Sequence, residues 1–225
     1  MPRLEHSWIL SEENAVALQI ELSKTVITND RFNRDINLVA GVDVAYSKCD
    51  NRIYSAVVIL AAATLAVVEI RTATDVVTFP YIPGLFAFRE IPPIIKALSL
   101  VENVPDLIVC DGQGIAHPRR FGLASHLGVL FDTPSIGCAK TKLFGESLHT
   151  PQKRGEYAEL YNGDDVVGCE LCTQDGIKPL YVSLGHRISL KSARSWILAL
   201  APKYRLPETT RKANETVNLL RNSSL

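Results

Sequence analysis

An apolar run that ends in an acid and leads into a loop of glycines and basic residues is the strongest chemical signal in this sequence. Leu107 to Cys110 has the length and β-branched content of a fully buried strand, and Asp111 closes it. A carboxylate at the end of a buried strand is costly to desolvate unless a cation or a metal ion compensates its charge. The loop then brings glycines that let a ligand approach the backbone and side chains suited to phosphate, namely Gly112, Gly114, His117, Arg119 and Arg120. We interpret this stretch as a metal-and-phosphate site on the edge of a sheet.

Two further acids stand out by their surroundings. Asp43 lies within Leu38 to Tyr46, a second run typical of a buried strand, where an isolated aspartate is rare. The alternative for this run is an edge strand on which Asp43 faces water. Glu90 lies beside the opening turn of an expected helix. Because buried carboxylates can also serve only in structural ion pairs, the residue types alone leave a metal site and a purely structural role open.

Three carboxylates with basic neighbours favour one kind of chemistry. Hard oxygen ligands suit Mg²⁺ or Mn²⁺, which keep waters and bind substrate phosphate. Such ions activate a water and stabilise the leaving oxygen of an in-line displacement. Lys140, Arg119 and Arg120 could neutralise a phosphate backbone. The chemistry that these residues favour is therefore hydrolysis of a phosphodiester.

The apolar pattern predicts the elements that must bring these side chains together. A short gap at residues 63–65 favours a hairpin, so the first three strands form an antiparallel meander. Pro92 and Pro93 are comfortable only in a first turn, so the helix that contains them either starts late or bends there. The expected helices are residues 11–27, 85–100, 122–131 and 190–200, and the expected strands are 38–46, 54–62, 66–74, 107–110 and 134–139. Residues 145–163 are expected to form a loop, and residues 165–172 and 179–184 a second, peripheral strand pair.

This order of elements is typical of the ribonuclease H-like topology, an α/β fold. It has a central mixed sheet, an antiparallel three-strand meander plus parallel strands, flanked by helices. In that arrangement the first and fourth strands lie side by side, so Asp43 and Asp111 would meet. The length of 225 residues and the lack of an internal repeat predict a single domain over residues 1–225.

The overall composition limits the classes of function. Lys and Arg number 24, as do Asp and Glu, so no net charge attracts nucleic acid to the whole molecule. This argues against a high-affinity nonspecific binder and leaves a site-specific enzyme open. The longest uncharged run, residues 53–68, is shorter than the roughly 20 residues of a membrane span, and residues 1–6 lack the apolar core of a secretory signal. We expect a cytoplasmic monomer without a membrane role, in which Cys169 and Cys172 are reduced thiols packed near a strand.

Several motifs in fixed order resemble the endonuclease V family over nearly the whole chain. They are residues 80–84 (Pro-Tyr-Ile-Pro-Gly), 88–90 (Phe-Arg-Glu), 111–120 (Asp-Gly-Gln-Gly-Ile-Ala-His-Pro-Arg-Arg), 124–128 (Ala-Ser-His-Leu-Gly) and 204–208 (Tyr-Arg-Leu-Pro-Glu). The resemblance implies a repair nuclease that depends on Mg²⁺, with Mn²⁺ as a substitute. It implies recognition of deaminated bases, above all hypoxanthine in deoxyinosine, in double- or single-stranded DNA. It also implies cleavage of the second phosphodiester bond 3′ to the lesion, with 3′-hydroxyl and 5′-phosphate ends.

The resemblance also implies roles for single residues. Asp43 and Asp111 match the metal-binding aspartates of the family, and Glu90 matches its third acidic residue, as a ligand or through a water. Lys140 matches the active-site lysine near the scissile phosphate. At position 214 the family commonly has His or Asp, whereas this chain has Asn214. An amide can hold a metal-bound water but cannot take its proton, so we expect Asn214 to position water or a ligand and not to act as a general base.

The loop formed by Pro80, Tyr81, Ile82, Pro83 and Gly84 matches the family's wedge, which enters the duplex. Tyr81 would fill the gap beside the displaced base; taken without the resemblance, it is a surface turn residue. Prolines remove the entropy of ordering the loop, and an aromatic ring can stack where a base has left. The glycines Gly112, Gly114 and Gly122 would leave room for a flat base. Backbone N–H groups could then donate hydrogen bonds to the O6 and N7 acceptors of hypoxanthine. Base extrusion costs a few kcal/mol, and least where pairing is weak.

For the other polar residues, the sequence predicts a structural role or leaves more than one role open. His117 either donates to a phosphate or to the flipped nucleotide, or braces the loop through a backbone carbonyl. Arg89 is expected to pair with a carboxylate or phosphate near the site. His126, in a helical pattern, is expected to be structural, and the role of His186 is open.

Two rival functions remain. The first is cleavage of inosine in RNA on the same fold, because nothing in the sequence reads the 2′-hydroxyl. The second is a catalytically weakened protein that binds an inosine duplex without nicking it, a reading motivated by Asn214. A ribonuclease H that acts on hybrids is disfavoured, because that activity has no need of the Pro-Tyr-Ile-Pro loop.

Overall fold

The apolar runs of the sequence become strands of one eight-stranded sheet in a computed structural model that describes residues 2–223. Their order across the sheet is β3-β2-β1-β4-β5-β8-β7-β6. Strands β1, β2 and β3 are antiparallel neighbours, whereas β1, β4 and β5 run parallel. The strands are β1 (Leu38–Tyr46), β2 (Arg52–Ala61), β3 (Val67–Val76), β4 (Leu107–Cys110), β5 (Ser135–Ala139), β6 (Tyr157–Asn162), β7 (Asp165–Leu171) and β8 (Leu180–His186). The predicted ribonuclease H-like arrangement is confirmed.

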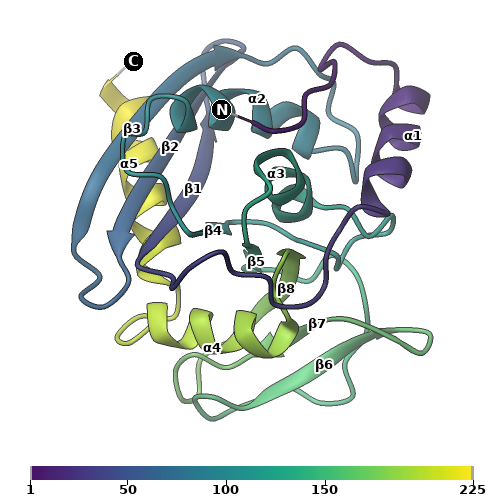
Figure 1. Cartoon of the computed structure of the whole chain (residues 1–225), viewed down its shortest axis with the longest axis vertical. Coiled ribbons are helices and arrows are strands. Elements are labelled where there is room, and N and C mark those ends of the chain that lie inside the picture. The colour runs from purple at the N-terminus through teal and green to yellow at the C-terminus, as the bar shows by residue number, and fades with distance from the viewer. Residues whose placement is uncertain (1, 224–225) are drawn as a thin grey trace.

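Helices cover both faces of this sheet (Figure 1). They are α1 (Glu12–Ser23), α2 (Ala87–Leu98), α3 (Leu123–Phe131), α4 (Leu190–Leu200) and α5 (Glu208–Ser223). Alternation along the strands divides the core, because Ala40 and Val42 pack with α2 and α3, whereas Val39 packs with α4. Val58 and Leu60 of β2 pack against α5 on the same side as α4. Helix α1 contacts α3 and lies on the other side of the molecule from β3 (Figure 1).

The C-terminal helix α5 is absent from the elements expected from the sequence, and it lies very close to β1. Gly41 makes this possible, since a Cβ atom there would lie 2.2 Å from the carbonyl oxygen of Thr209. Thr209, Ala213 and Val217 are buried at intervals of four residues along the helix, and Pro207 precedes its first turn. This spacing was the overlooked signal. The close approach brings the middle of α5 against the carboxyl-terminal half of β1.

The expected loop over residues 145–163 is wrong over residues 157–162, and the expected strand pair β7–β8 forms but is not peripheral. Residues Tyr157–Asn162 form strand β6, in which Ala158 and Leu160 alternate inward, and a two-residue Gly163-Asp164 turn connects β6 to β7. Strand β8 is not peripheral, because it pairs with β5 in the middle of the sheet. The apolar alternation in β6 is short and has polar flanks, which is why it was read as a loop.

Two helix boundaries also differ from the expectation. Helix α1 ends at Ser23 and not at residue 27. Helix α2 begins at Ala87 and continues through Pro92 and Pro93, so the prolines do not lie in its first turn. The carbonyl of Pro93 accepts a hydrogen bond from Oγ of Ser55, 2.7 Å away, on the neighbouring strand β2.

The remaining sequence expectations concern single residues. His126 is buried, with its Nε2 2.7 Å from Nε2 of His6, and therefore has a structural environment. His186 accepts a hydrogen bond at Nδ1 from the amide of Ile27. Cys169 and Cys172 are free, buried thiols, as expected. Within residues 2–223, none of the helices has the length and apolarity that crossing a membrane requires.

Candidate active site

Asp43 and Asp111 lie side by side on neighbouring parallel strands. Val42 of β1 is in register with Cys110 of β4; Asp43 is the next residue of β1, and Asp111 is the first residue after β4. Strand β1 is flanked by β2 and β4, so the alternative of an edge strand is wrong. Burial raises the pKa of Asp43 to about 6, and the negative charge of Asp111 acts in the same direction. The two carboxylates thus share a site in which both being ionised is unfavourable.

Glu90 approaches the same site from helix α2. Burial and, to a lesser extent, the charge of Asp43 raise its pKa to about 7. The hydroxyl of Tyr46, on β1, lies 3.3 Å from Oε1 of Glu90 and donates to it. Burial and the charge of Glu90 raise the pKa of Tyr46 to about 12, so its hydroxyl stays protonated and remains a donor. Three carboxylates therefore converge from β1, β4 and α2.

Each aspartate has one donor beside it. The ammonium group of Lys140, the first residue after β5, forms an ion pair with Oδ2 of Asp111. The side-chain amide of Asn214, on α5, donates to Oδ2 of Asp43 across 2.8 Å. Lys140 beside Asp111 and Arg89 near Glu90 supply two positive charges against three carboxylates, so the site has negative charge left to neutralise.

The chemistry of these donors fits a hard divalent cation. Among residues 2–223, no three His, Cys, Asp or Glu side chains lie close enough together to form an all-protein metal cage. Mg²⁺ seldom uses such a cage, because it keeps several waters and binds through one or two carboxylates and substrate phosphate. Asp43 and Asp111 provide two carboxylates, and burial together with the charge of Asp111 raises the pKa of Asp43, which a cation bound between them would lower. These two residues could hold the ion, with Glu90 and Asn214 close enough to act through water.

A cavity of about 440 Å³ opens beside Asp111. Its walls come from the loop before α2, from the loop between β4 and α3, and from the end of β5. Members of the lining include Gly84, Phe86, Glu90, Gly112, His117, Gly122, Lys140 and Leu143. Gly114 instead lies against the backbone, because a Cβ atom there would be 1.9 Å from the carbonyl oxygen of Leu184. Of the three glycines expected to admit a base, only Gly112 and Gly122 therefore line the cavity.

The loop over residues 80–84 is held at its end by one carbonyl group. The carbonyl oxygen of Gly84 accepts hydrogen bonds from Nε2 of His117 at 2.9 Å, Nη2 of Arg119 at 2.8 Å and Nε2 of Gln19 at 3.1 Å. Gly84 has a φ of +80°, and a Cβ atom there would lie 2.7 Å from Nη2 of Arg119. Gln19 was not predicted as a site residue, although a buried glutamine on the apolar side of α1 was a readable signal.

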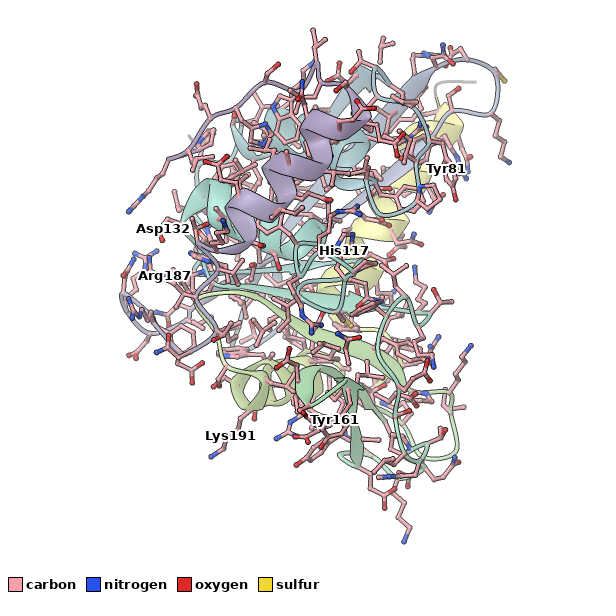
Figure 2. The ribbon with its side chains drawn as sticks, turned by 90° about the vertical axis from the view of Figure 1, so that its right-hand side faces the viewer. Tyr81, His117, Asp132, Tyr161, Arg187 and Lys191 are labelled. Carbon is pink, nitrogen blue, oxygen red and sulfur yellow. The ribbon has the colours of Figure 1, made fainter. Side chains whose placement is uncertain are left out.

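Arg89 holds the other end of the same loop. Its Nη1 donates to the carbonyl of Phe79 at 2.9 Å, and its Nε lies 3.3 Å from the hydroxyl of Tyr46. Arg89 thus points inward as expected, but its partners are a carbonyl and a phenol and not a carboxylate. Between the two anchored ends, Tyr81 is 67% exposed and meets Phe86 edge-on at 4.9 Å between ring centroids. Figure 2 shows Tyr81 near the edge of the molecule, across the view from Asp132 and Arg187.

His117 has the environment of a loop-bracing residue. Its Nδ1 accepts from the backbone amide of Arg119 at 3.2 Å, so Nε2 carries the proton that is donated to Gly84. Burial lowers the pKa of His117 to about 4, which keeps the ring neutral at physiological pH. The bond to a backbone carbonyl agrees with the bracing alternative. A role of His117 toward nucleotide stays a prediction.

The two arginines of the same loop also make internal contacts. Arg119 donates from Nε to Oε1 of Gln19 at 2.5 Å, in addition to its bond to the carbonyl of Gly84. Arg120 has a φ of +55°, and its Nη2 donates to Asp165 at 3.0 Å while its guanidinium lies 5.5 Å from the ring centroid of Phe144. Their predicted binding to phosphate would compete with these contacts and stays a prediction.

Comparisons with known proteins agree with this geometry. A family model described as Endonuclease V matches residues 20–215. An endonuclease V from a Nostoc species is 46% identical over 210 residues, which are 93% of this chain and 95% of the relative. The crystal structure of Streptomyces avermitilis endonuclease V superposes with a TM-score of 0.92 at 47% identity, over 99% of this chain and 98% of that one. The crystal structure of a Ciona intestinalis endonuclease V is of a complex with a 24mer DNA containing an inosine followed by a ribo-adenosine. It superposes with a TM-score of 0.83 at 27% identity, over 96% of this chain and 100% of that one.

Proposed function

The chain belongs to the endonuclease V family, and from that premise we propose that it is a DNA repair endonuclease that recognises deaminated bases, chiefly hypoxanthine in deoxyinosine. It hydrolyses the second phosphodiester bond 3′ to the lesion and leaves 3′-hydroxyl and 5′-phosphate ends. The observation that carries this proposal is the pairing of Asp43 with Asp111, on neighbouring strands beside a 440 Å³ cavity.

The residues of the site divide the catalytic work. A Mg²⁺ or Mn²⁺ ion held by Asp43 and Asp111 would activate the attacking water and stabilise the leaving oxygen. Lys140 carries its charge beside Asp111, where it can neutralise the scissile phosphate. Tyr46 orients Oε1 of Glu90, so that this third carboxylate faces the two aspartates in a fixed direction. Asn214 fixes Oδ2 of Asp43 in the same way.

The cavity and the loop beside it account for lesion recognition. A volume of 440 Å³ lies within the range of about 300–1,000 Å³ common for ligand pockets, and it can accept one extruded base. Tyr81 is exposed on a loop whose two ends are fixed through Phe79 and Gly84, so the ring is placed before the substrate arrives. A ring that is already ordered loses little entropy when it stacks in the gap left by the base.

Inosine in RNA is a second candidate substrate. The DNA in the Ciona intestinalis complex carries a ribo-adenosine directly after the inosine, so a 2′-hydroxyl is present beside the lesion in that relative. Carried over to this chain, the same site would accept inosine in RNA or at a ribonucleotide junction.

A nicking assay on a deoxyinosine oligonucleotide, with and without Mg²⁺, tests the proposal. We expect one nick at the second bond 3′ to the inosine, only with Mg²⁺, and none in the Asp43→Ala variant, which should still bind the lesion. A matched inosine RNA at equal salt ranks the two substrates. Absence of a nick in the wild-type protein, with Mg²⁺ and intact lesion binding, would leave a binding protein as the function.

A further inference from the structure

The guanidinium group of Arg205, in the segment before α5, joins three parts of the chain near the site. Its Nη2 donates to the carbonyl of Lys140 at 3.2 Å and to that of Pro179 at 2.9 Å, and its Nε donates to Lys178 at 2.7 Å. Its own carbonyl accepts from Oγ1 of Thr173 at 2.7 Å. Arg205 is therefore fixed at both its backbone and its side chain, and one of its partners is the proposed catalytic lysine.

The end of the sheet explains why this carbonyl needs a side-chain donor. The pairing between β5 and β8 ends where Ala139 meets Tyr181, one residue before Lys140. Pro179, which precedes β8, lies opposite Thr141 when this register is continued, and it has no N–H to offer the Thr141 carbonyl. The planar fork of Arg205 supplies donors at this point, as a backbone strand would. On the other side, Nε2 of Gln113 donates to the carbonyl of Thr141 at 3.2 Å.

We propose that Arg205 is a positioning residue that sets the reach of Lys140 toward Asp111 and the scissile phosphate. The inference rests on the proposed function. Lys140 follows the last residue of β5, so its carbonyl lies beyond the β5–β8 ladder and is held by Arg205, and its long side chain transmits any shift of the backbone to the ammonium group. A misplacement of about 1 Å at a catalytic group can cost about 100-fold in rate. Gln113 anchors the carbonyl of Thr141, and Arg205 anchors the carbonyl of Lys140.

Arg154 provides a matched control in the same part of the fold. It too donates to three carbonyls, those of Thr173, Ala201 at 2.7 Å and Leu198 at 2.9 Å. Arg154 and Arg205 therefore make the same kind of clamp on neighbouring segments. Only the clamp of Arg205 includes a residue of the proposed site.

Single-turnover and steady-state nicking rates on a deoxyinosine duplex with Mg²⁺ distinguish the role of Arg205 from that of Arg154. We expect Arg205→Ala to lower kcat by about 10- to 100-fold with KM within about twofold, because the change displaces the ammonium beside Asp111 and leaves the other walls of the cavity in place. Arg205→Lys should give an intermediate kcat, since one ammonium cannot span three carbonyls. Arg154→Ala should keep kcat within about twofold, although both alanine variants should lower Tm to a similar extent.

A second measurement does not depend on nuclease activity. Acetic anhydride labels lysine amines, and mass spectrometry gives the rate at Lys140 relative to Lys191, an exposed lysine on α4 (Figure 2). We expect faster relative labelling of Lys140 in Arg205→Ala and an unchanged ratio in Arg154→Ala. If the wild-type protein does not nick inosine, the proposed function fails, and labelling alone decides the role of Arg205. Wild-type kcat in Arg205→Ala, an equal loss in Arg154→Ala, or unchanged labelling would overturn the inference.

Discussion

The side-chain amide of Asn214 donates from Nδ2 to Oδ2 of Asp43 across 2.8 Å, between residues 171 positions apart in the chain. This hydrogen bond lowers the pKa of Asp43 and so opposes the effect of burial. It ties the C-terminal helix to the centre of the sheet. The sequence suggested only that Asn214 could position water, whereas the structure gives its amide nitrogen a partner in the proposed catalytic pair.

Replacing this amide by an acid should lower the stability of the metal-free protein without lowering turnover at saturating Mg²⁺. In Asn214→Asp, two carboxylates would face each other without a bridging donor, so we expect the free energy of unfolding without metal to fall by about 1–3 kcal/mol at pH 7. Saturating Mg²⁺ should remove most of this loss, and turnover should equal or exceed that of the wild type. Urea unfolding in EDTA and in Mg²⁺, together with the nicking rate, gives both quantities. A large loss of turnover at saturating Mg²⁺ would show that the amide itself is required.

Truncating the wedge residue should affect selectivity more than stability. Tyr81 is 67% exposed, so Tyr81→Ala should change the free energy of unfolding by no more than about 0.5 kcal/mol. If Tyr81 stacks beside the displaced base, the preference for inosine over undamaged duplex should fall by about 1–3 kcal/mol. Competition binding with both duplexes measures this preference. Leu148→Ala, at a residue that is 92% exposed, is the control; unchanged selectivity in Tyr81→Ala would remove the wedge assignment.

Glu90 should make the metal-free protein less stable as the pH rises. Its pKa in the folded state, about 7, lies above its ordinary value of 4.5, so its contribution is fully present below pH 4.5 and is lost as the pH rises through 7. Glu90→Gln removes this loss. In EDTA, the variant should therefore gain about 1–3 kcal/mol over the wild type between pH 5 and pH 8. Glu102→Gln, at an acid whose side chain is 81% exposed, should show no such trend. If the difference in unfolding free energy between Glu90→Gln and the wild type did not change with pH, the raised pKa of Glu90 would be contradicted.

His117 should have the opposite pH dependence. Its folded-state pKa of about 4 is below the ordinary value of 6.5, so its stabilising contribution is complete above pH 6.5 and is lost as the pH falls through 4. His117→Gln keeps a donor for Gly84 but does not titrate. We expect this variant to be about 1 kcal/mol less stable at pH 7.5, with the difference shrinking toward pH 4. His6, His126 and His186 have lowered pKa values too, so only the difference from wild type isolates His117. A difference that widens on acidification would contradict a neutral, bracing imidazole.

The sequence was sufficient to place the two aspartates. The apolar runs around Asp43 and before Asp111 are each complete within a few residues, so local pattern identifies the strands. The order of strands and helices then restricts the topology, because parallel strands joined by a helix follow one handedness. Adjacency of Asp43 and Asp111 follows from those two facts. Strand β6 and helix α5 escape sequence reasoning because β6 is short and the apolar residues of α5 are few among polar ones.

The tertiary structure alone determined which side chains hold the site in place. Arg119, Arg120 and His117 have types suited to phosphate, yet their hydrogen bonds are to Gln19, Gly84 and Asp165. Arg205 and Asn214 reach Lys140 and Asp43 from the far end of the chain. Residue type states what a donor can bind, but a hydrogen bond requires a separation near 3 Å. Which acceptor comes that close depends on how distant segments pack, as in the approach of α5 to Gly41, and no local pattern contains that information.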